Sequence, residues 1–78
     1  MSKKDKLINF IKNNPKNVRF EDLKKILKDI GYVARNRSGS HYIFTREYSK
    51  PITIPYKRPV KIIYVKQVLR ILEEEEEN

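Results

Sequence analysis

The sequence predicts a single α+β domain in which two helices precede a three-stranded antiparallel sheet and a third helix follows it. The chain has 78 residues, which suits one domain. Apolar residues recur at spacings of three and four in the first 30 residues and again after residue 60, which is typical of helices. Between these regions, short aromatic and β-branched runs alternate with turn residues, which is typical of strands and hairpins.

The first helix is expected at residues 3–13. The run from Ser2 to Asp5 matches a capping box, and an apolar stripe follows it. The Asn-Asn-Pro sequence at residues 13–15 should end the helix. The stripe consists of Leu7, Phe10 and Ile11.

A second helix is expected to end at Gly31, which favours the left-handed conformation of a helix C-terminus. Glu21 and Asp22 suit its positive N-terminal end. Its apolar face is formed by Phe20, Leu23, Ile26, Leu27 and Ile30.

Three strands should follow. The first covers Tyr32 to Arg37, and the turn Ser38-Gly39-Ser40 joins it to a second strand at His41 to Arg46. Glu47 to Lys50 is predicted as a loop. Pro51 to Pro55 has proline at both ends, which suits an edge strand.

Strand alternation separates the side chains of the second strand into two faces. Phe44 is the better candidate for the core face. His41 would then lie on the other face, which an antiparallel sheet of this kind leaves open. The two sets are His41, Ile43 and Thr45 on one face, and Tyr42, Phe44 and Arg46 on the other.

The last helix should begin between Val60 and Ile63 and bury one stripe of side chains, formed by Val65, Val68, Leu69 and Leu72. The run Glu73 to Glu77 places negative charge at the negative end of this helix, so we expect this segment to fray and to act as a solubilising tail. The predicted layout is an N-terminal helical extension at 1–17, a core at 18–72 and an acidic tail at 73–78.

The charge of the chain indicates a polyanionic partner. The 18 basic and ten acidic residues give a net charge of +8, and without the acidic run 18 basic and five acidic residues give +13. A domain with this charge attracts nucleic acid by releasing its condensed counterions. An acidic protein is the second candidate for the partner.

Composition also limits the compartment and the chemistry. The chain has no cysteine, which fits a reducing cytoplasm. No apolar run approaches the ~20 residues of a membrane span, and the first residues do not match a secretory signal. With one histidine and no cysteine, the chain lacks the usual ligands of a transition-metal site. Ser38 and Ser40 have no nearby acidic residue that would complete a catalytic triad with His41. The chain has only two glycines, which is too few for a glycine-rich phosphate-binding loop.

RNA cleavage remains a chemistry that these residues could perform, because RNA supplies its own nucleophile in the 2′-hydroxyl group. A histidine with the ordinary pKa of about 6.5 acts as an acid or a base at neutral pH. Arginine and lysine bind the phosphate and its developing charge. A second acid or base is needed, and a tyrosine, a lysine or water would have to serve. The competing interpretation of His41 is a polar surface residue without a role.

The hexapeptide GSHYIF, Gly39 to Phe44, resembles the Gly-Ser-His-x-x-Phe signature of HicA toxins, the small RNA-cleaving partners of bacterial and archaeal toxin–antitoxin pairs. Val18 to Tyr32 is similar to the first core helix of this family, and Pro51 to Leu72 is similar to its third strand, basic loop and last helix. The resemblance covers residues 18–72, and residues 3–13 resemble an extension found in a subset of the family.

The resemblance implies an α-β-β-β-α fold similar to double-stranded RNA-binding domains, here with an extra N-terminal helix. It also implies metal-independent cleavage of mRNA without a cofactor, a HicB-like antitoxin that covers the site, and His41 as the catalytic residue. Many members have His-His at this point, whereas this chain has His41-Tyr42. The residues expected to contact RNA are Arg35, Arg37, Ser38, Gly39, Ser40, Lys57, Arg58 and Lys61.

Three alternatives stay open. A non-catalytic RNA-binding module of the same fold accounts for every feature except His41. A winged-helix DNA-binding protein would use the hairpin as its wing, although the third strand and the long last helix fit that plan less well. A protein-interaction domain would use its positive surface to bind an acidic partner.

Overall fold

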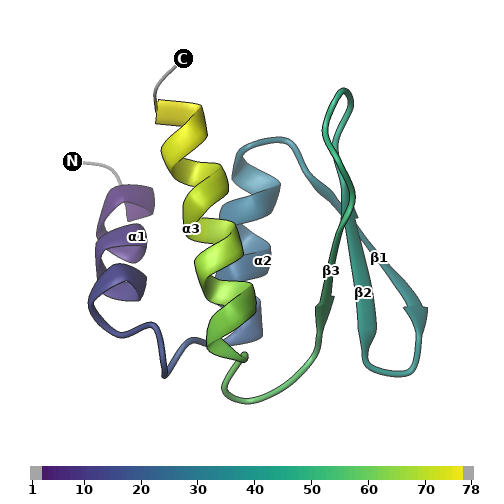
Figure 1. Cartoon of the computed structure of the whole chain (residues 1–78), viewed down its shortest axis with the longest axis horizontal. Coiled ribbons are helices and arrows are strands. Elements are labelled where there is room, and N and C mark those ends of the chain that lie inside the picture. Colours follow the sequence, from purple (N-terminus) through teal and green to yellow (C-terminus); the bar gives the residue numbers. More distant parts are fainter. Residues whose placement is uncertain (1–2, 77–78) are drawn as a thin grey trace.

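The structure is a computed structural model in which residues 3–76 are described, with side chains for residues 6–75 (Figure 1). The element order is helix, helix, strand, strand, strand, helix, as predicted. The elements are α1 (Lys3–Asn13), α2 (Phe20–Asp29), β1 (Val33–Ser38), β2 (His41–Thr45), β3 (Ile52–Pro55) and α3 (Ile62–Glu76). The proposed cap at Ser2 lies outside the described residues.

The three strands form an antiparallel sheet in the order β1-β2-β3. Phe44 of β2 lies opposite Ala34 of β1 and Ile52 of β3, and Tyr42 lies opposite Ile54 of β3. Residues directly opposite each other project to the same side of a sheet. These side chains therefore belong to the inner face, which packs on the helices.

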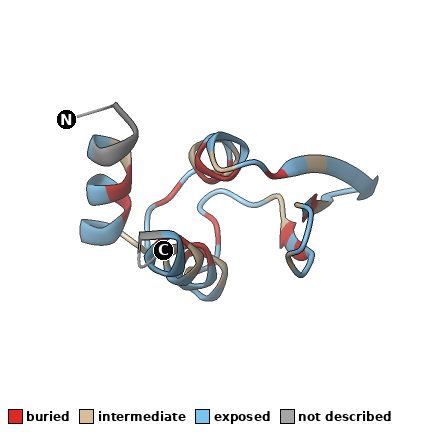
Figure 2. Cartoon of the chain, turned by 90° about the horizontal axis from the view of Figure 1, so that it is seen from above, coloured by how far each residue is buried: buried red, intermediate tan, exposed pale blue. Residues whose placement is uncertain are grey.

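The helices cover one face of the sheet, and no element of the described chain covers the other (Figure 1). Phe44 is completely buried, which confirms it as the core residue of β2, whereas His41 is exposed. In Figure 2 the buried residues of the helices face the interior, while much of the β1–β2 hairpin is exposed. The α+β fold and its open sheet face are thus as predicted.

The apolar stripe of α1 differs from the predicted one. Ile8 and Ile11 are buried, Leu7 is partly buried, and 49% of Phe10 is exposed. Two apolar faces of α1 are compatible with the helical spacing, and both contain Leu7 and Ile11. One of them also contains Ile8, and the other contains Phe10. Packing against α2 and α3 selects the stripe with Ile8, which spacing alone did not distinguish.

The end of α2 follows the prediction. Gly31 has φ +101°, and its N–H donates to the carbonyl of Lys28 at 3.1 Å. The N–H of Tyr32 donates to the carbonyl of Leu27 at 2.9 Å. A residue with a side chain would be strained at this φ, so glycine lets the chain leave α2 and enter β1.

The prediction that the acidic segment frays is wrong for residues 73–76. Helix α3 starts at Ile62, within the predicted range, and continues to Glu76. An ion pair between Glu75 and Arg46, next to β2, holds this end of the helix and offsets the unfavourable charge at its C-terminus. Glu77 lies outside the described residues.

Within residues 3–76, no helix combines the length and apolarity needed to cross a membrane.

Candidate functional site

His41 is the first residue of β2 and follows a tight turn. Gly39 has φ +54°, which glycine adopts without strain, and its carbonyl accepts a hydrogen bond of 2.9 Å from the Asn36 side-chain amide. The pairing of β1 with β2 shifts between Asn36 and Ser38, which marks a bulge. The turn and the bulge place His41 at the end of the hairpin, exposed on the open face of the sheet.

Tyr42 lies on the opposite face from His41. Its ring is partly buried, and its centroid is 4.9 Å from that of Phe20 in α2. The ring is therefore part of the packing between sheet and helix. The Tyr42 side chain therefore points away from the open face.

The hairpin adds two exposed cations beside His41. Arg35 lies opposite Ile43, which shares a face with His41, so Arg35 also belongs to the open face. Arg37 lies within the bulge and is exposed. Ser38, Gly39 and Ser40 are exposed as well. Arg37 to Ser40 thus lie at the same end of the sheet as His41, whereas Arg35 lies further along β1, opposite the middle of β2.

The loop between β3 and α3 reaches the same end of the sheet (Figure 1). Pro55, the last residue of β3, lies opposite His41, and the next N–H, that of Tyr56, donates to the carbonyl of Ser40 at 2.6 Å. We call residues 56–61 the basic loop. It carries the exposed side chains of Lys57, Arg58 and Lys61.

The basic loop is anchored at its far end too. Val60 is buried, and its N–H donates to the carbonyl of Val18 at 2.9 Å. Lys61 directly precedes α3, and its carbonyl accepts hydrogen bonds from the N–H groups of Tyr64 and Val65 at 3.0 and 3.3 Å. Lys61 thus lies at the positive N-terminal end of α3, where an anion is favoured.

Arg58 makes contacts within the protein that the sequence did not indicate. Its Nη2 donates to Oε1 of Glu21 at 3.1 Å, and its Nε donates to the Tyr56 hydroxyl at 3.0 Å. The Tyr56 hydroxyl in turn donates to the same Glu21 oxygen at 3.1 Å. Tyr56 and Glu21 are 35 positions apart, so no spacing rule links them.

The pKa of Glu21 is lowered from its ordinary value of 4.5. The largest cause is a hydrogen bond from its own backbone N–H, and the Tyr56 hydroxyl and the Arg58 guanidinium lower the pKa further. The hydrogen bond to Tyr56 raises the pKa of Arg58. Glu21 is therefore a carboxylate at neutral pH and accepts from both partners.

A family model described as the HicA toxin of bacterial toxin–antitoxin systems matches residues 20–74 of the chain. The chain belongs to the HicA toxin family. The match runs from the first residue of α2 into the acidic end of α3, and α1 lies outside it. No curated protein and no solved structure matches the chain.

Membership of the HicA family makes this protein a toxin of a toxin–antitoxin system and implies a cognate antitoxin as its partner. The matched region contains His41, the whole sheet and the basic loop. Among the described residues, no group of three or more His, Cys, Asp and Glu side chains is placed to hold a metal ion.

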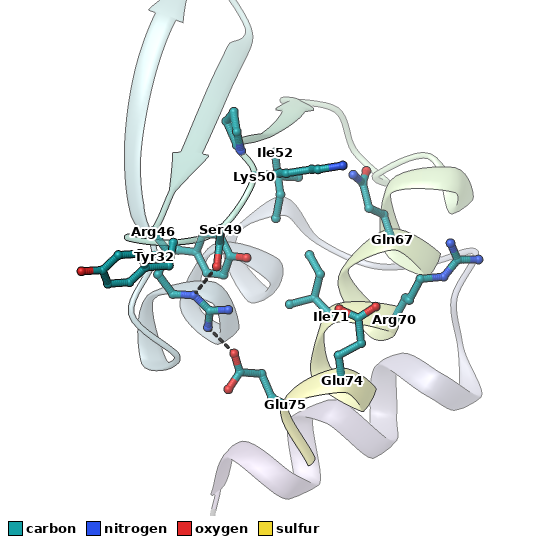
Figure 3. A pocket seen from close by; sticks show the side chains of 12 residues that line it. Tyr32, Arg46, Ser49, Lys50, Ile52, Gln67, Arg70, Ile71, Glu74 and Glu75 are labelled. Atoms are coloured by element: carbon teal, nitrogen blue, oxygen red, sulfur yellow. Dashed lines mark hydrogen bonds and ion pairs between the residues drawn. The ribbon is translucent and has the colours of Figure 1, made fainter. Parts of the chain in front are cut away.

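At the opposite end of the sheet, an arginine at the edge of a pocket is held by contacts within the protein (Figure 3). A pocket of about 550 Å³ lies between the β2–β3 loop and the C-terminal half of α3. Arg46 lies at its edge, where it donates to the carbonyl of Ile30 at 3.0 Å and to the Ser49 hydroxyl at 3.1 Å. Its guanidinium also pairs with Glu75 and lies 4.6 Å from the centre of the Tyr32 ring. This cation therefore joins α2, the β2–β3 loop and α3.

Proposed function

We propose that this HicA-family toxin is an endoribonuclease that cleaves mRNA without a metal ion, with His41 as the general acid or base. The observation that carries the proposal is the meeting of His41 with the basic loop at one end of an uncovered sheet face. Pro55 lies opposite His41, and the Tyr56 N–H donates to the carbonyl of Ser40 at 2.6 Å.

The reaction is a transesterification within the RNA. A base takes the proton of a 2′-hydroxyl, whose oxygen then attacks the adjacent phosphorus. The bond from phosphorus to the 5′-oxygen breaks, and an acid donates a proton to that oxygen. A cyclic 2′,3′-phosphate and a 5′-hydroxyl result. An imidazole is suited to either proton transfer near neutral pH, and such a group typically contributes 10²–10⁴-fold in rate.

The cations around His41 would bind the RNA backbone. Arg35, Arg37 and Lys57 are exposed and form no ion pair within the described residues. Lys61 lies at the N-terminus of α3, whose dipole also favours a phosphate. The turn Ser38-Gly39-Ser40 is exposed, so RNA bound at His41 would lie near the backbone of this turn. Arg58 would contribute its charge while it remains bound to Glu21.

We do not assign the second proton transfer to Tyr42, because this ring packs against Phe20 on the inner face of the sheet. A lysine of the basic loop or a water molecule would serve. A HicB-like antitoxin would inhibit the toxin by covering the open face around His41, and the toxin would act in the cytoplasm.

The test is RNA cleavage in EDTA by the purified, antitoxin-free protein beside its His41→Ala variant. Cleavage should persist in EDTA and fall by about 10²–10⁴-fold in the variant, as expected for loss of a general acid or base. Thr45→Ala, an exposed change on the same face of β2, is the matched control and should cleave normally. If neither wild type nor variant cuts RNA while both bind it, the protein is a non-catalytic RNA-binding module.

Preference for duplex DNA over RNA would instead favour the winged-helix interpretation. Binding to neither nucleic acid would favour a domain whose positive surface serves an acidic protein. Both comparisons use the same purified protein and require no variant.

A further inference from the structure

We propose that Glu21 is a positioning residue, which holds the basic loop against the His41 turn through the hydroxyl group of Tyr56. The inference rests on the proposed function, because the task of the positioned loop is to bind RNA. It assigns a role to a carboxylate on α2 that has no part in the proton transfers.

Tyr56 links three elements around the site. Its backbone N–H bonds to Ser40, the residue before His41. Its ring lies 4.9 Å from that of Phe20 in α2 and is partly buried. Its hydroxyl donates to Glu21 and accepts from Arg58, two residues further along the loop. A shift of Tyr56 would therefore move the loop relative to the histidine.

Glu21 fixes the orientation of Tyr56. One oxygen, Oε1, accepts from both the Tyr56 hydroxyl and Nη2 of Arg58, each at 3.1 Å. The three groups thus close a ring of hydrogen bonds. Arg58, which is 70% exposed in its side chain, is held by this ring and by its position 5.7 Å from the centre of the Tyr56 ring.

An exposed ion pair alone would not support this role, because such pairs contribute little to stability. The difference here is the partly buried tyrosine, whose packing on Phe20 limits where its hydroxyl can lie. The hydrogen bonds to Glu21 add to this packing at the start of the basic loop, while the exposed ion pair itself contributes little to the free energy of unfolding. The expected consequence is a change in RNA binding rather than unfolding.

If only charge mattered, removal of the Glu21 carboxylate would strengthen RNA binding, whereas the positioning role predicts weaker binding. A carboxylate near a bound polyanion repels it, so replacing the charge should tighten RNA binding. Asp22 provides a matched control, since it is the next residue in the same helical turn and pairs with Arg19 at 3.3 Å, away from Tyr56. The two substitutions add the same charge and differ in their contact with the loop.

The experiment measures binding of a fully 2′-O-methylated RNA, which lacks the nucleophile, to the wild type and to Glu21→Gln, Tyr56→Phe and Asp22→Asn. Glu21→Gln and Tyr56→Phe should each weaken binding by about threefold to tenfold, roughly the contribution of one phosphate contact. The double variant Glu21→Gln/Tyr56→Phe should be no weaker than the worse single variant. Asp22→Asn should bind equally or more tightly. Tighter or unchanged binding by Glu21→Gln would overturn the proposal.

A second measurement separates this proposal from the proposed function. Hydrogen exchange of the Tyr56 amide, which donates to Ser40, reports on the loop without RNA. This exchange should be about tenfold faster in Glu21→Gln and Tyr56→Phe than in the wild type or Asp22→Asn. If the wild type binds no RNA, the proposed function fails, and the exchange rates still show whether Glu21 orders the loop. Unchanged rates would contradict the positioning role.

Discussion

The two ends of the three-stranded sheet both carry arginines, but these arginines are held in different ways. On β1, Arg37 near His41 and Arg35 in mid-strand are exposed, and neither forms an ion pair with another described residue. At the opposite end, the Arg46 guanidinium contacts Ile30, Ser49, Glu75 and the Tyr32 ring. A cation whose hydrogen bonds are already made stabilises the fold, whereas an exposed cation without such partners is available to a phosphate.

The acidic residues lie mainly near the Arg46 end. Glu73 to Glu76 extend α3 toward the Arg46 end, and Glu47 lies in the adjacent loop. A polyanion would be repelled there and attracted to the His41 end. The proposed RNA surface therefore lies at the opposite end of the sheet from the contacts of Arg46, and moving charge at either end tests this difference.

The largest expected effect comes from charge reversal at one end only. The double variant Lys57→Glu/Lys61→Glu and the double variant Lys50→Glu/Arg70→Glu both lower the formal net charge from +8 to +4. The first should weaken RNA binding by on the order of 100-fold, and the second by less than about tenfold, because only the first removes proposed phosphate contacts. Fluorescence anisotropy with one RNA at fixed salt measures both. Equal losses would show that net charge alone drives binding.

The next effect is on stability. Arg46→Met should lower the free energy of unfolding by about 2 kcal/mol, since a charged donor to the Ile30 carbonyl and the contact with Tyr32 are lost. Urea denaturation at neutral pH measures this change. Arg70→Met is the control, because Arg70 lines the same pocket and is exposed, and it should change stability little. A stability loss for Arg70→Met as large as that for Arg46→Met would contradict the assigned role of Arg46.

A smaller effect is expected from a single lysine. Lys61→Ala should weaken RNA binding by about threefold to tenfold and lower the slope of log K against log salt by about one contact. Lys28→Ala, an exposed change on α2, should leave the slope unchanged. Binding titrations over a range of salt concentrations give both slopes. Equal slopes for Lys61→Ala and the wild type would place the RNA away from the basic loop.

The smallest effect concerns pH. Folding lowers the pKa of Glu21, mainly through its backbone N–H and then through Tyr56 and Arg58, so its ionised form favours the folded state. This contribution is present above the ordinary pKa of 4.5 and is lost as pH falls through the lowered pKa. Stability measured from pH 6 to pH 2.5 should therefore fall less steeply in Glu21→Gln than in the wild type. Identical curves would show that the Glu21 contacts do not contribute to folding.

The sequence predicted the element order because each helix and strand carries a local signal, such as the stripe of α2 or the glycine at its end. It also predicted His41 on the open face, since alternation from Phe44 fixes the face of every residue in β2. In α1, two overlapping stripes were compatible with the spacing, so packing against α2 and α3 decided between them.

The remaining features depend on contacts between distant residues. Local charge rules predicted that the end of α3 would fray, yet Arg46, 29 positions before Glu75, holds that end in place. The ring of Glu21, Tyr56 and Arg58 likewise joins α2 to the basic loop without any local pattern. Such pairs become visible only when the fold brings the segments together.

The most direct test of the central claim uses one RNA whose cleavage site has been mapped, beside the same RNA with a single 2′-deoxy ribose immediately 5′ to the cleaved phosphate. Attack by the 2′-hydroxyl predicts that cleavage at this phosphate disappears, while cleavage elsewhere in the same molecule continues as the internal control. Equal cleavage of both RNAs at the mapped phosphate would contradict a reaction in which His41 serves the 2′-hydroxyl.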